Sequence, residues 1–164
     1  AFDIRLSMFE ACARLGIPAV TAAPLGMGTA LMNFLPGQMG FDDYFGWTGQ
    51  SEDDRALRFM IGLAPRLLQD YLADPSRVNL SARQGPSTIM ACQLCAGVAA
   101  TEVLKLVLGR GKVRGAPHGM QFDAYLNKMV TTWRPGGNRN PIQRIMLAVA
   151  RRRLAAMRRQ ANLG

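Results

Sequence analysis

The sequence predicts an α/β fold. A helical pattern over residues 3–15 is followed at once by a short apolar segment that predicts a strand, which is the order of an α/β unit. Two pairs of strand-like segments are each joined by a short turn. The chain has 164 residues, of which 49% are apolar, enough for the core of one domain. That apolar fraction excludes global disorder.

The first three elements are a helix and a β-hairpin. In residues 3–15 the apolar side chains recur at helical spacing, and Gly16 supplies the stop. Residues 17–23 are short and apolar, which predicts a buried strand, and residues 29–34 predict a second strand. The turn Gly26-Met27-Gly28 between them favours a hairpin.

The next stretch is aromatic and then helical. Residues 41–50 match neither period, which predicts a loop that buries its rings. Ser51 and Asp54 have the spacing of a capping box, so a helix is expected to begin there. Gly62 and Pro65 are expected to split the apolar stripe that follows, up to residue 72, into two helices.

A turn is expected at residues 74–76, before the longest helix. Pro86-Ser87-Thr88 opens this helix, which runs to Leu108 and closes at Gly109. It is apolar on nearly every face until Glu102, so we expect a central, buried helix. Polar residues interrupt its apolar run, which argues against a membrane span.

The last elements are a hairpin and a basic helix. Residues 120–125 and 128–133 predict antiparallel strands joined at Leu126-Asn127, and a Gly/Asn/Pro loop follows. Residues 141–160 predict a helix with one apolar stripe before arginines take over; the stripe consists of Ile142, Ile145, Met146 and Val149.

The formal net charge of +9 is unevenly distributed. Residues 1–109 contain 8 Lys/Arg and 10 Asp/Glu, a net −2, whereas residues 110–164 contain 12 Lys/Arg and one acid, Asp123, a net +11. Residues 135–164 hold no aromatic side chain on which bases could stack. We therefore expect a solvated or partner-facing helix in preference to one that binds nucleic acid.

The spacing of Cys92 and Cys95 is that of half a zinc site or of a redox pair. The remaining zinc ligands would have to come from Cys12 and the single histidine, His118. Since the pair falls inside an apolar helix, we expect buried structural thiols and no zinc. Three cysteines cannot all pair and no secretory signal opens the sequence, so a reduced, cytoplasmic setting is expected.

Other chemical motifs are weak. Gly26-Met27-Gly28 lacks the third glycine and the strand-to-helix context of a nucleotide-binding loop, and no GxxxxGK[ST] occurs. With one histidine and no GxSxG, a serine hydrolase triad is not expected. Two acidic runs, at residues 42–43 and 52–54, have the composition of a cation site, but we interpret them as partners of helix dipoles.

Three segments together resemble one enzyme family. Residues 2–5, followed by a helix, Cys12 and Gly16-Ile17-Pro18-Ala19-Val20, resemble the "DNxxxR … C…GIP-V" segment of the ThiF/MoeB and ubiquitin-activating-type adenylyltransferases. Residues 97–109 are similar to that family's "slqA-EaiKll-G" helix, and residues 122–125 to its following "YDa" strand. The resemblance covers most of residues 2–133, in the family's order.

The resemblance implies the C-terminal half of a Rossmann-like adenylation domain, with a mixed sheet, a β-hairpin packed by helices, and a basic C-terminal helix. The family uses ATP and magnesium to adenylate the C-terminal carboxylate of a ubiquitin-like or sulfur-carrier protein. Its Gly-rich nucleotide loop and magnesium-associated Asp have no counterpart in this sequence. We therefore expect a fragment that is inactive alone, with residues 1–133 forming the adenylation part and residues 134–164 the basic loop and helix.

Residue by residue, the resemblance matches Arg5 to the Arg of "DNxxxR", a supporting role at the nucleotide and metal corner. Glu102 and Lys105 match the late helix, where a structural role is expected. The family's two zinc-binding CxxC pairs are absent, because Cys92 and Cys95 lie inside that helix. The resemblance also implies a carrier-protein partner and a homodimer.

A different class of function remains open beside this one. The net +11 of the last third is typical of a noncatalytic module whose basic C-terminal helix docks onto an acidic protein or a nucleic acid. A zinc or redox module at Cys92 and Cys95 is a third and weaker hypothesis.

Overall fold

A four-stranded antiparallel sheet forms the centre of the fold. The computed structural model describes residues 2–72 and 87–161. The strands lie in chain order, β1 (Ala19–Leu25), β2 (Gly28–Phe34), β3 (His118–Asp123) and β4 (Lys128–Trp133). Both predicted hairpins are confirmed, with Leu25 opposite Gly28 and Asp123 opposite Lys128.

The α/β class is confirmed, and the pairing of the strands refines it. The resemblance implied a mixed sheet, whereas all three strand pairs that the structure describes are antiparallel. Parallel pairing is limited, in these residues, to the isolated bridges Gly26–Ser87 and Asn33–Gly115. The central strand pair has Leu31 of β2 opposite Met120 of β3.

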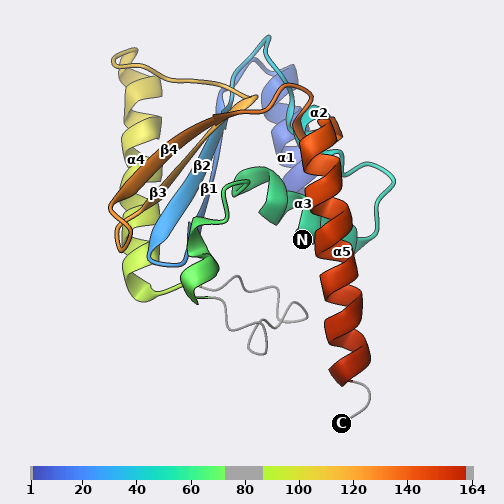
Figure 1. Cartoon of the computed structure of the whole chain (residues 1–164). Coiled ribbons are helices and arrows are strands. Elements are labelled where there is room, and N and C mark those ends of the chain that lie inside the picture. Colours follow the sequence, from blue (N-terminus) through green and yellow to red (C-terminus); the bar gives the residue numbers. More distant parts are fainter. Residues whose placement is uncertain (1, 73–86, 162–164) are drawn as a thin grey trace.

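Helix α4 (Ile89–Leu108) lies along β1 and β2 on one face of the sheet (Figure 1). The Thr88 hydroxyl accepts a hydrogen bond from the Ala91 N–H (3.3 Å), and Gly109 ends the helix at a φ of +59°. These are the start and stop expected from the sequence, because a hydroxyl at the N-cap and a left-handed glycine at the C-terminus satisfy the free backbone groups.

The expectation that α4 is a central, buried helix is wrong. Only Ala91 and Glu102 are buried, and six large apolar side chains are exposed: Ile89, Met90, Val103, Leu104, Val107 and Leu108. The helix packs on the sheet with one side, and its other side carries no described layer. Of the described helices, α4 alone is long and apolar enough to cross a membrane by length and composition, which is weak support for a span.

The opposite face of the sheet carries an aromatic core. Helices α1 (Phe2–Arg14), α2 (Phe41–Phe45) and α3 (Glu52–Leu63) surround it (Figure 1). Its buried rings are Phe34, Phe41, Tyr44, Phe45 and Trp47. Phe9 of α1 stacks on Phe41 with ring centroids 4.3 Å apart. Offset-stacked and edge contacts between rings stabilise a core beyond the burial of area.

The predicted loop at residues 41–50 does bury its rings, but it begins with a short helix. Gly40 starts α2, where the Asp43 carboxylate accepts a hydrogen bond from the Gly40 N–H (3.3 Å), and Gly46 ends it at a φ of +64°. A helix of five residues is too short to show a 3.6-residue period, so the pattern could not reveal it.

The split of the next helical stretch is confirmed. Helix α3 ends at Leu63, and the following segment is a 3-10 helix, η1 (Leu68–Leu72). The Ser51 hydroxyl accepts a hydrogen bond from the Asp54 N–H (3.3 Å), which confirms the expected cap. The turn predicted at residues 74–76 lies outside the described residues.

The chain ends with helix α5 (Pro141–Ala161), which packs against α3 and the 3-10 helix η4 (Gly137–Arg139) and extends beyond the body (Figure 1). The predicted apolar stripe does not form the packed face, because Ile142, Ile145 and Val149 are exposed. The packed face instead holds Gln143 and Leu147, which are fully buried.

A hydrogen bond explains the orientation of α5. The Gln143 side chain donates to the Ile61 carbonyl at 3.2 Å, inside the contact with α3. A buried amide needs such a partner, so this bond and the Leu147 contact together turn the Ile142 side of the helix toward solvent.

Candidate functional site

Arg5, the residue matched to the "DNxxxR" motif, lies on α1 beside the aromatic core. Its guanidinium carbon is 4.8 Å from the centroid of the Phe59 ring of α3, a cation–π contact. Burial lowers the pKa of Arg5 from its usual value. No described acid forms an ion pair with it, so its guanidinium N–H donors keep the capacity to bind an anion.

Near Arg5, an ion pair between Asp3 and Arg55 attaches α1 to α3. The Asp3 carboxylate accepts a hydrogen bond from Arg55 of α3 at 2.5 Å. This hydrogen bond lowers the pKa of Asp3, and the positive charge of Arg55 adds to the effect. The position of Arg5 is therefore set by two contacts between α1 and α3.

Neither acidic run forms a cation site in the described residues. Asp42 accepts hydrogen bonds from the Trp47 N–H (2.6 Å), the Thr48 N–H (3.0 Å) and the Thr48 hydroxyl (2.6 Å). Burial opposes ionisation of Asp42, but these bonds outweigh it and the pKa is lowered. The carboxylate oxygens are thus used to hold the end of α2.

Asp54, in the second run, joins α3 to α5. It pairs with Arg151 through Nε (2.6 Å) and Nη2 (2.7 Å) and with Arg58 through Nε (2.7 Å). The hydrogen bonds from Arg151 lower the pKa of Asp54; burial opposes them, and Arg58 adds to the lowering. The same pairing raises the pKa of Arg151. The sequence did not reveal this contact, because the two residues are 97 positions apart.

The Gly26-Met27-Gly28 turn does not fit a nucleotide phosphate. It closes the β1–β2 hairpin, and a Cβ on Gly28 would overlap the Phe122 carbonyl, so this glycine is needed for strand packing. The Met27 N–H, which would face a phosphate in such a loop, donates to the Tyr71 hydroxyl at 3.0 Å. The described residues also contain no group of three or more His, Cys, Asp or Glu side chains with metal-ligand geometry.

Asp123, from the segment similar to "YDa", organises the loops at this end of the sheet. It is buried, accepts a hydrogen bond from the Tyr71 hydroxyl (2.8 Å), and accepts another from the Leu126 N–H (2.9 Å). Burial, and then the bond to Asp123, raises the pKa of Tyr71. The contacts indicate a structural role for Asp123.

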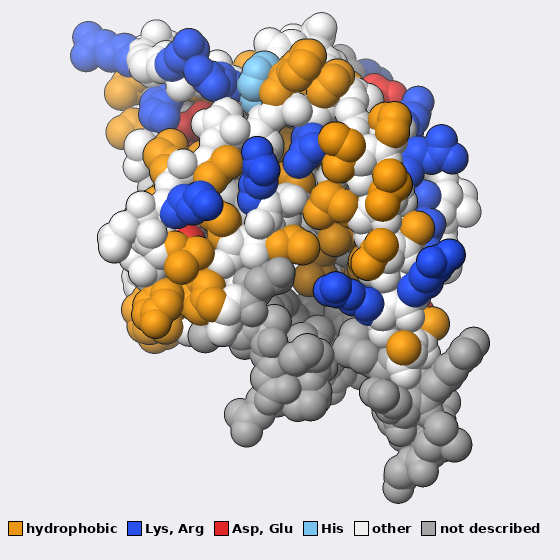
Figure 2. Space-filling model, in the orientation of Figure 1, with side chains coloured by type: hydrophobic (Ala, Val, Ile, Leu, Met, Phe, Trp, Pro, Cys, Tyr) orange, Lys and Arg blue, Asp and Glu red, His pale blue; other side chains and the backbone are white. Residues whose placement is uncertain are grey.

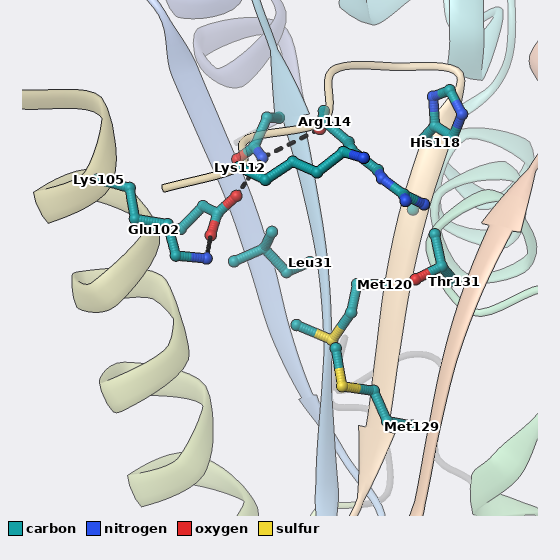
Figure 3. Close-up of a pocket in the computed structure, with 11 residues that line it drawn as sticks. Leu31, Glu102, Lys105, Lys112, Arg114, His118, Met120, Met129 and Thr131 are labelled. Carbon is teal, nitrogen blue, oxygen red and sulfur yellow. Dashed lines mark hydrogen bonds and ion pairs between the residues drawn. The ribbon is translucent and has the colours of Figure 1, made fainter. Parts of the chain in front are cut away.

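A cavity of about 270 Å³ lies beside α4 and is lined by residues of β2, β3 and β4 (Figure 3). Glu102 of α4 accepts a hydrogen bond from the Asn33 amide (2.8 Å) and pairs with Lys105 (2.6 Å). These contacts tie α4 to β2, in agreement with the structural role expected for Glu102 and Lys105. Lys112 and Arg114 also line the cavity, and the sequence patterns did not indicate them.

The expected burial of the CxxC pair is wrong for Cys92. Cys92 is exposed and Cys95 is partly buried, because they lie on α4, whose outer side faces solvent. His118 is the first residue of β3, and its Nδ1 lies 3.2 Å from the Gly115 carbonyl oxygen. Neither cysteine is grouped with His118 in the described residues.

Positive charge on α5 adjoins exposed apolar side chains. Figure 2 shows hydrophobic side chains in a row along α5, with Lys and Arg side chains beside them. Ile142, Ile145 and Val149 are exposed, as are Arg144 and Arg152. This mixed surface contrasts with Arg151 on the same helix, which is paired with Asp54.

Similarity to known proteins is found in both the structure and the sequence of the chain. The chain is similar to the crystal structure of E. coli MccB with AMPCPP and SeMet MccA, with a TM-score of 0.48 and 13% identity. The similarity covers 80% of this chain and 33% of the MccB chain, so this chain spans about a third of MccB's length. No curated protein matches the chain. A family model described as "ThiF family" matches residues 1–144, and the chain therefore belongs to the ThiF family.

Proposed function

We propose that the chain is part of an ATP-dependent adenylyltransferase that activates the C-terminal carboxylate of a ubiquitin-like or sulfur-carrier protein. The observation that carries the proposal is the ThiF family match over residues 1–144. This chain matches about a third of the length of MccB, whose crystal structure contains AMPCPP and MccA. Adenylation requires the carboxylate to be held in line with the α-phosphate while cationic groups offset the developing charge.

In this proposal most of the residues that bind ATP and magnesium lie outside the part of the chain that the structure describes. The Gly26-Met27-Gly28 hairpin is closed by Tyr71 and by strand packing, and the described acids at residues 42 and 54 are held by protein donors. The chain contributes Arg5, whose guanidinium is positioned by Phe59 and has no acidic partner among the described residues. We assign it a supporting role at the edge of the nucleotide site.

A titration and an exchange assay test whether the nucleotide-binding residues lie outside this chain. We expect isothermal titration of the 164-residue chain with ATP and magnesium to show no binding; tight binding would contradict the proposal that the nucleotide half is separate. Restoring the residues upstream of Ala1 should create ATP–pyrophosphate exchange that depends on the carrier protein. No exchange by the restored protein with any ubiquitin-like or sulfur-carrier protein would refute the activity itself.

Arg5 is tested in the restored protein against a matched residue. Arg5→Ala should lower the exchange rate by about tenfold or more. Losing a donor placed directly on the transition state costs about 100-fold or more, and Arg5 is assigned a supporting role. Arg14→Ala removes an exposed arginine from the same helix and should leave the rate unchanged. Equal rates for both variants would remove Arg5 from the site.

A second candidate function rests on α5. Exposed Ile142, Ile145 and Val149 beside Arg144 and Arg152 form the surface of a helix that docks onto an acidic protein, with apolar contact and charge combined. The test is the double variant Arg144→Gln and Arg152→Gln, which spares the buried residues of α5. Binding to an acidic protein that weakens steeply with salt and with this variant supports the function; binding to DNA or RNA of the same salt dependence would replace it.

The adenylyltransferase proposal also includes a homodimer in the cytoplasm. The exposed apolar side of α4, with Leu104 and Val107, supports a further interface. Light scattering coupled to size exclusion measures the oligomeric state directly. A dimer that Leu104→Lys converts to a monomer is expected, and a monomer in the unmodified protein would refute this part.

A further inference from the structure

The cavity between α4 and the sheet has walls from four elements and a loop. Helix α4 covers β1 and β2 but leaves the same face of β3 and β4 open (Figure 3). Asn33 and Leu31 of β2 form one wall, and Met120 and Met129 of the second hairpin form another. Asn33 faces this side while its neighbour Phe34 faces the aromatic core, because successive strand residues point to opposite faces. The cavity is therefore separated by the sheet from Arg5.

Positive charge in this cavity is not balanced by protein groups. Its one carboxylate, Glu102, is held by Lys105 and by Asn33. Lys112 and Arg114 form no ion pair with any described acid, and Figure 3 shows both side chains extending across the cavity toward β3. Two neighbouring cations without an acid repel each other, and a bound anion relieves that repulsion through charge-assisted hydrogen bonds.

A buried acceptor in the same wall also lacks a partner. The Asn33 side chain donates through Nδ2 to Glu102 (2.8 Å) and to the Arg114 carbonyl (3.1 Å), which fixes the orientation of its amide. Its Oδ1 is buried and has no hydrogen-bond partner. Buried polar atoms are normally satisfied, but this oxygen has almost no accessible surface, so it does not by itself define the ligand.

The rest of the lining combines apolar side chains with two polar ones, His118 and Thr131. The apolar side chains of Leu31, Met120 and Met129 line one part of the cavity, and Met129 is 68% exposed (Figure 3). Methionine side chains adapt to irregular apolar groups. A cavity of about 270 Å³ is at the small end of ligand sites. These dimensions suit a small organic anion better than an inorganic ion alone.

We propose that this cavity binds a small organic anion, a phosphate or carboxylate carried on an apolar group. Lys112 and Arg114 hold the anionic group, and Met120, Met129 and Leu31 contact the apolar part. The site shares no residue with the proposed adenylation function, so either can fail without the other.

The test uses the 164-residue chain and three probes: phenyl phosphate, octanoate and inorganic phosphate. We expect calorimetric titration to show saturable binding of phenyl phosphate or octanoate, with inorganic phosphate at least about tenfold weaker because it has no apolar part. A preference between the first two shows which combination of anionic and apolar group fits the cavity better. Equal affinity for all three, or no binding of any, overturns the proposal.

Variants separate a site from general attraction to a basic protein. Lys112→Gln with Arg114→Gln should weaken the preferred probe by about tenfold or more. The matched control, Arg14→Gln with Arg153→Gln, removes the same charge from exposed positions of α1 and α5 outside both the cavity and the proposed α5 surface, and it should leave the affinity unchanged. Equal weakening by both pairs means nonspecific attraction and overturns the site.

Met129→Ser tests the apolar wall. It should weaken binding of the organic probe without changing that of inorganic phosphate. Loss of both, or of neither, contradicts the assigned contact. Because Lys112, Arg114 and Met129 are all exposed, circular dichroism should show unchanged folding in each variant.

Discussion

The ion pair between Asp54 and Arg151 should determine how firmly α5 is attached to α3. The pair joins residues 97 positions apart through two short hydrogen bonds, of 2.6 and 2.7 Å. Replacing Asp54 by Asn removes the charge and keeps the shape of the side chain. The replacement leaves two cations, Arg151 and Arg58, without their carboxylate.

The magnitude follows from the exposure of the two partners. The Asp54 side chain is 16% exposed and that of Arg151 is 45% exposed, so the pair lies between the surface and buried cases. Exposed pairs contribute about 0.2–1 kcal/mol, and removing one partner of a buried pair costs about 3–5 kcal/mol. We expect Asp54→Asn to cost about 1–2 kcal/mol of unfolding free energy, a decrease in Tm of about 2–8 °C for a domain of this size.

A double-mutant cycle in urea isolates the pair. Asp54→Asn and Arg151→Gln are measured alone and together, and we expect a coupling energy of about 1 kcal/mol. Arg152→Gln is the matched control; its residue is exposed, and it should change stability by less than about 0.5 kcal/mol. A coupling within about 0.3 kcal/mol of zero would refute the reasoning and leave Leu147 and Gln143 as the contacts that hold α5.

The same pair gives a pH dependence with a defined sign. Because its folded-state pKa is lowered, Asp54 binds protons less readily in the folded protein than in the unfolded chain. Its contribution is therefore complete above the unfolded-state pKa of about 3.9 and is lost as the pH falls through the lower folded-state value. The stability difference between the wild-type chain and Asp54→Asn should shrink below about pH 4, and a difference that grows there would contradict this sign.

Two further predictions concern buried backbone contacts. Asn138→Ala should cost about 2–4 kcal/mol in urea unfolding, because the buried Asn138 amide donates to two carbonyls at 2.9 Å. Asn140→Ala should cost only about 1 kcal/mol, because it removes the hydrogen bond from the Ile142 N–H that caps the start of α5; equal costs would contradict the role of Asn138. Gly28→Ala should abolish the native circular dichroism signal, because the new Cβ overlaps the Phe122 carbonyl. Gly97→Ala, on α4 with no atom within 4 Å of the new Cβ, should instead stabilise the chain by about 0.5–1 kcal/mol, and its destabilisation would refute the placement.

Local chemistry made the element order predictable. The second hairpin turns at Asn127, which adopts a φ of +50°, and the first turns at Gly26 with a φ of +62°. Asparagine and glycine tolerate this conformation, so the turns are visible in the sequence. The caps of α4 at Thr88 and Gly109 were predictable for the same reason.

Burial was less predictable, since it depends on distant residues. Helix α4 is apolar around most of its circumference, so its sequence could not show which side meets the sheet or that the other side has no described cover. In α5 the buried position of Gln143 runs against its polarity, and the sequence could not show that its amide N–H would donate to the Ile61 carbonyl. Both errors arise from contacts between segments far apart in the chain.

The cations of the C-terminal third lie in different environments in the fold. Its net charge of +11 favours a single basic surface when the sequence is considered alone. In the structure Arg151 is neutralised by Asp54, while Lys112 and Arg114 line a cavity on the other face of the sheet from the aromatic core. A nucleic-acid groove needs many cations along one continuous path. Because these described cations are divided among an ion pair, a cavity and the exposed side of α5, they do not form such a path.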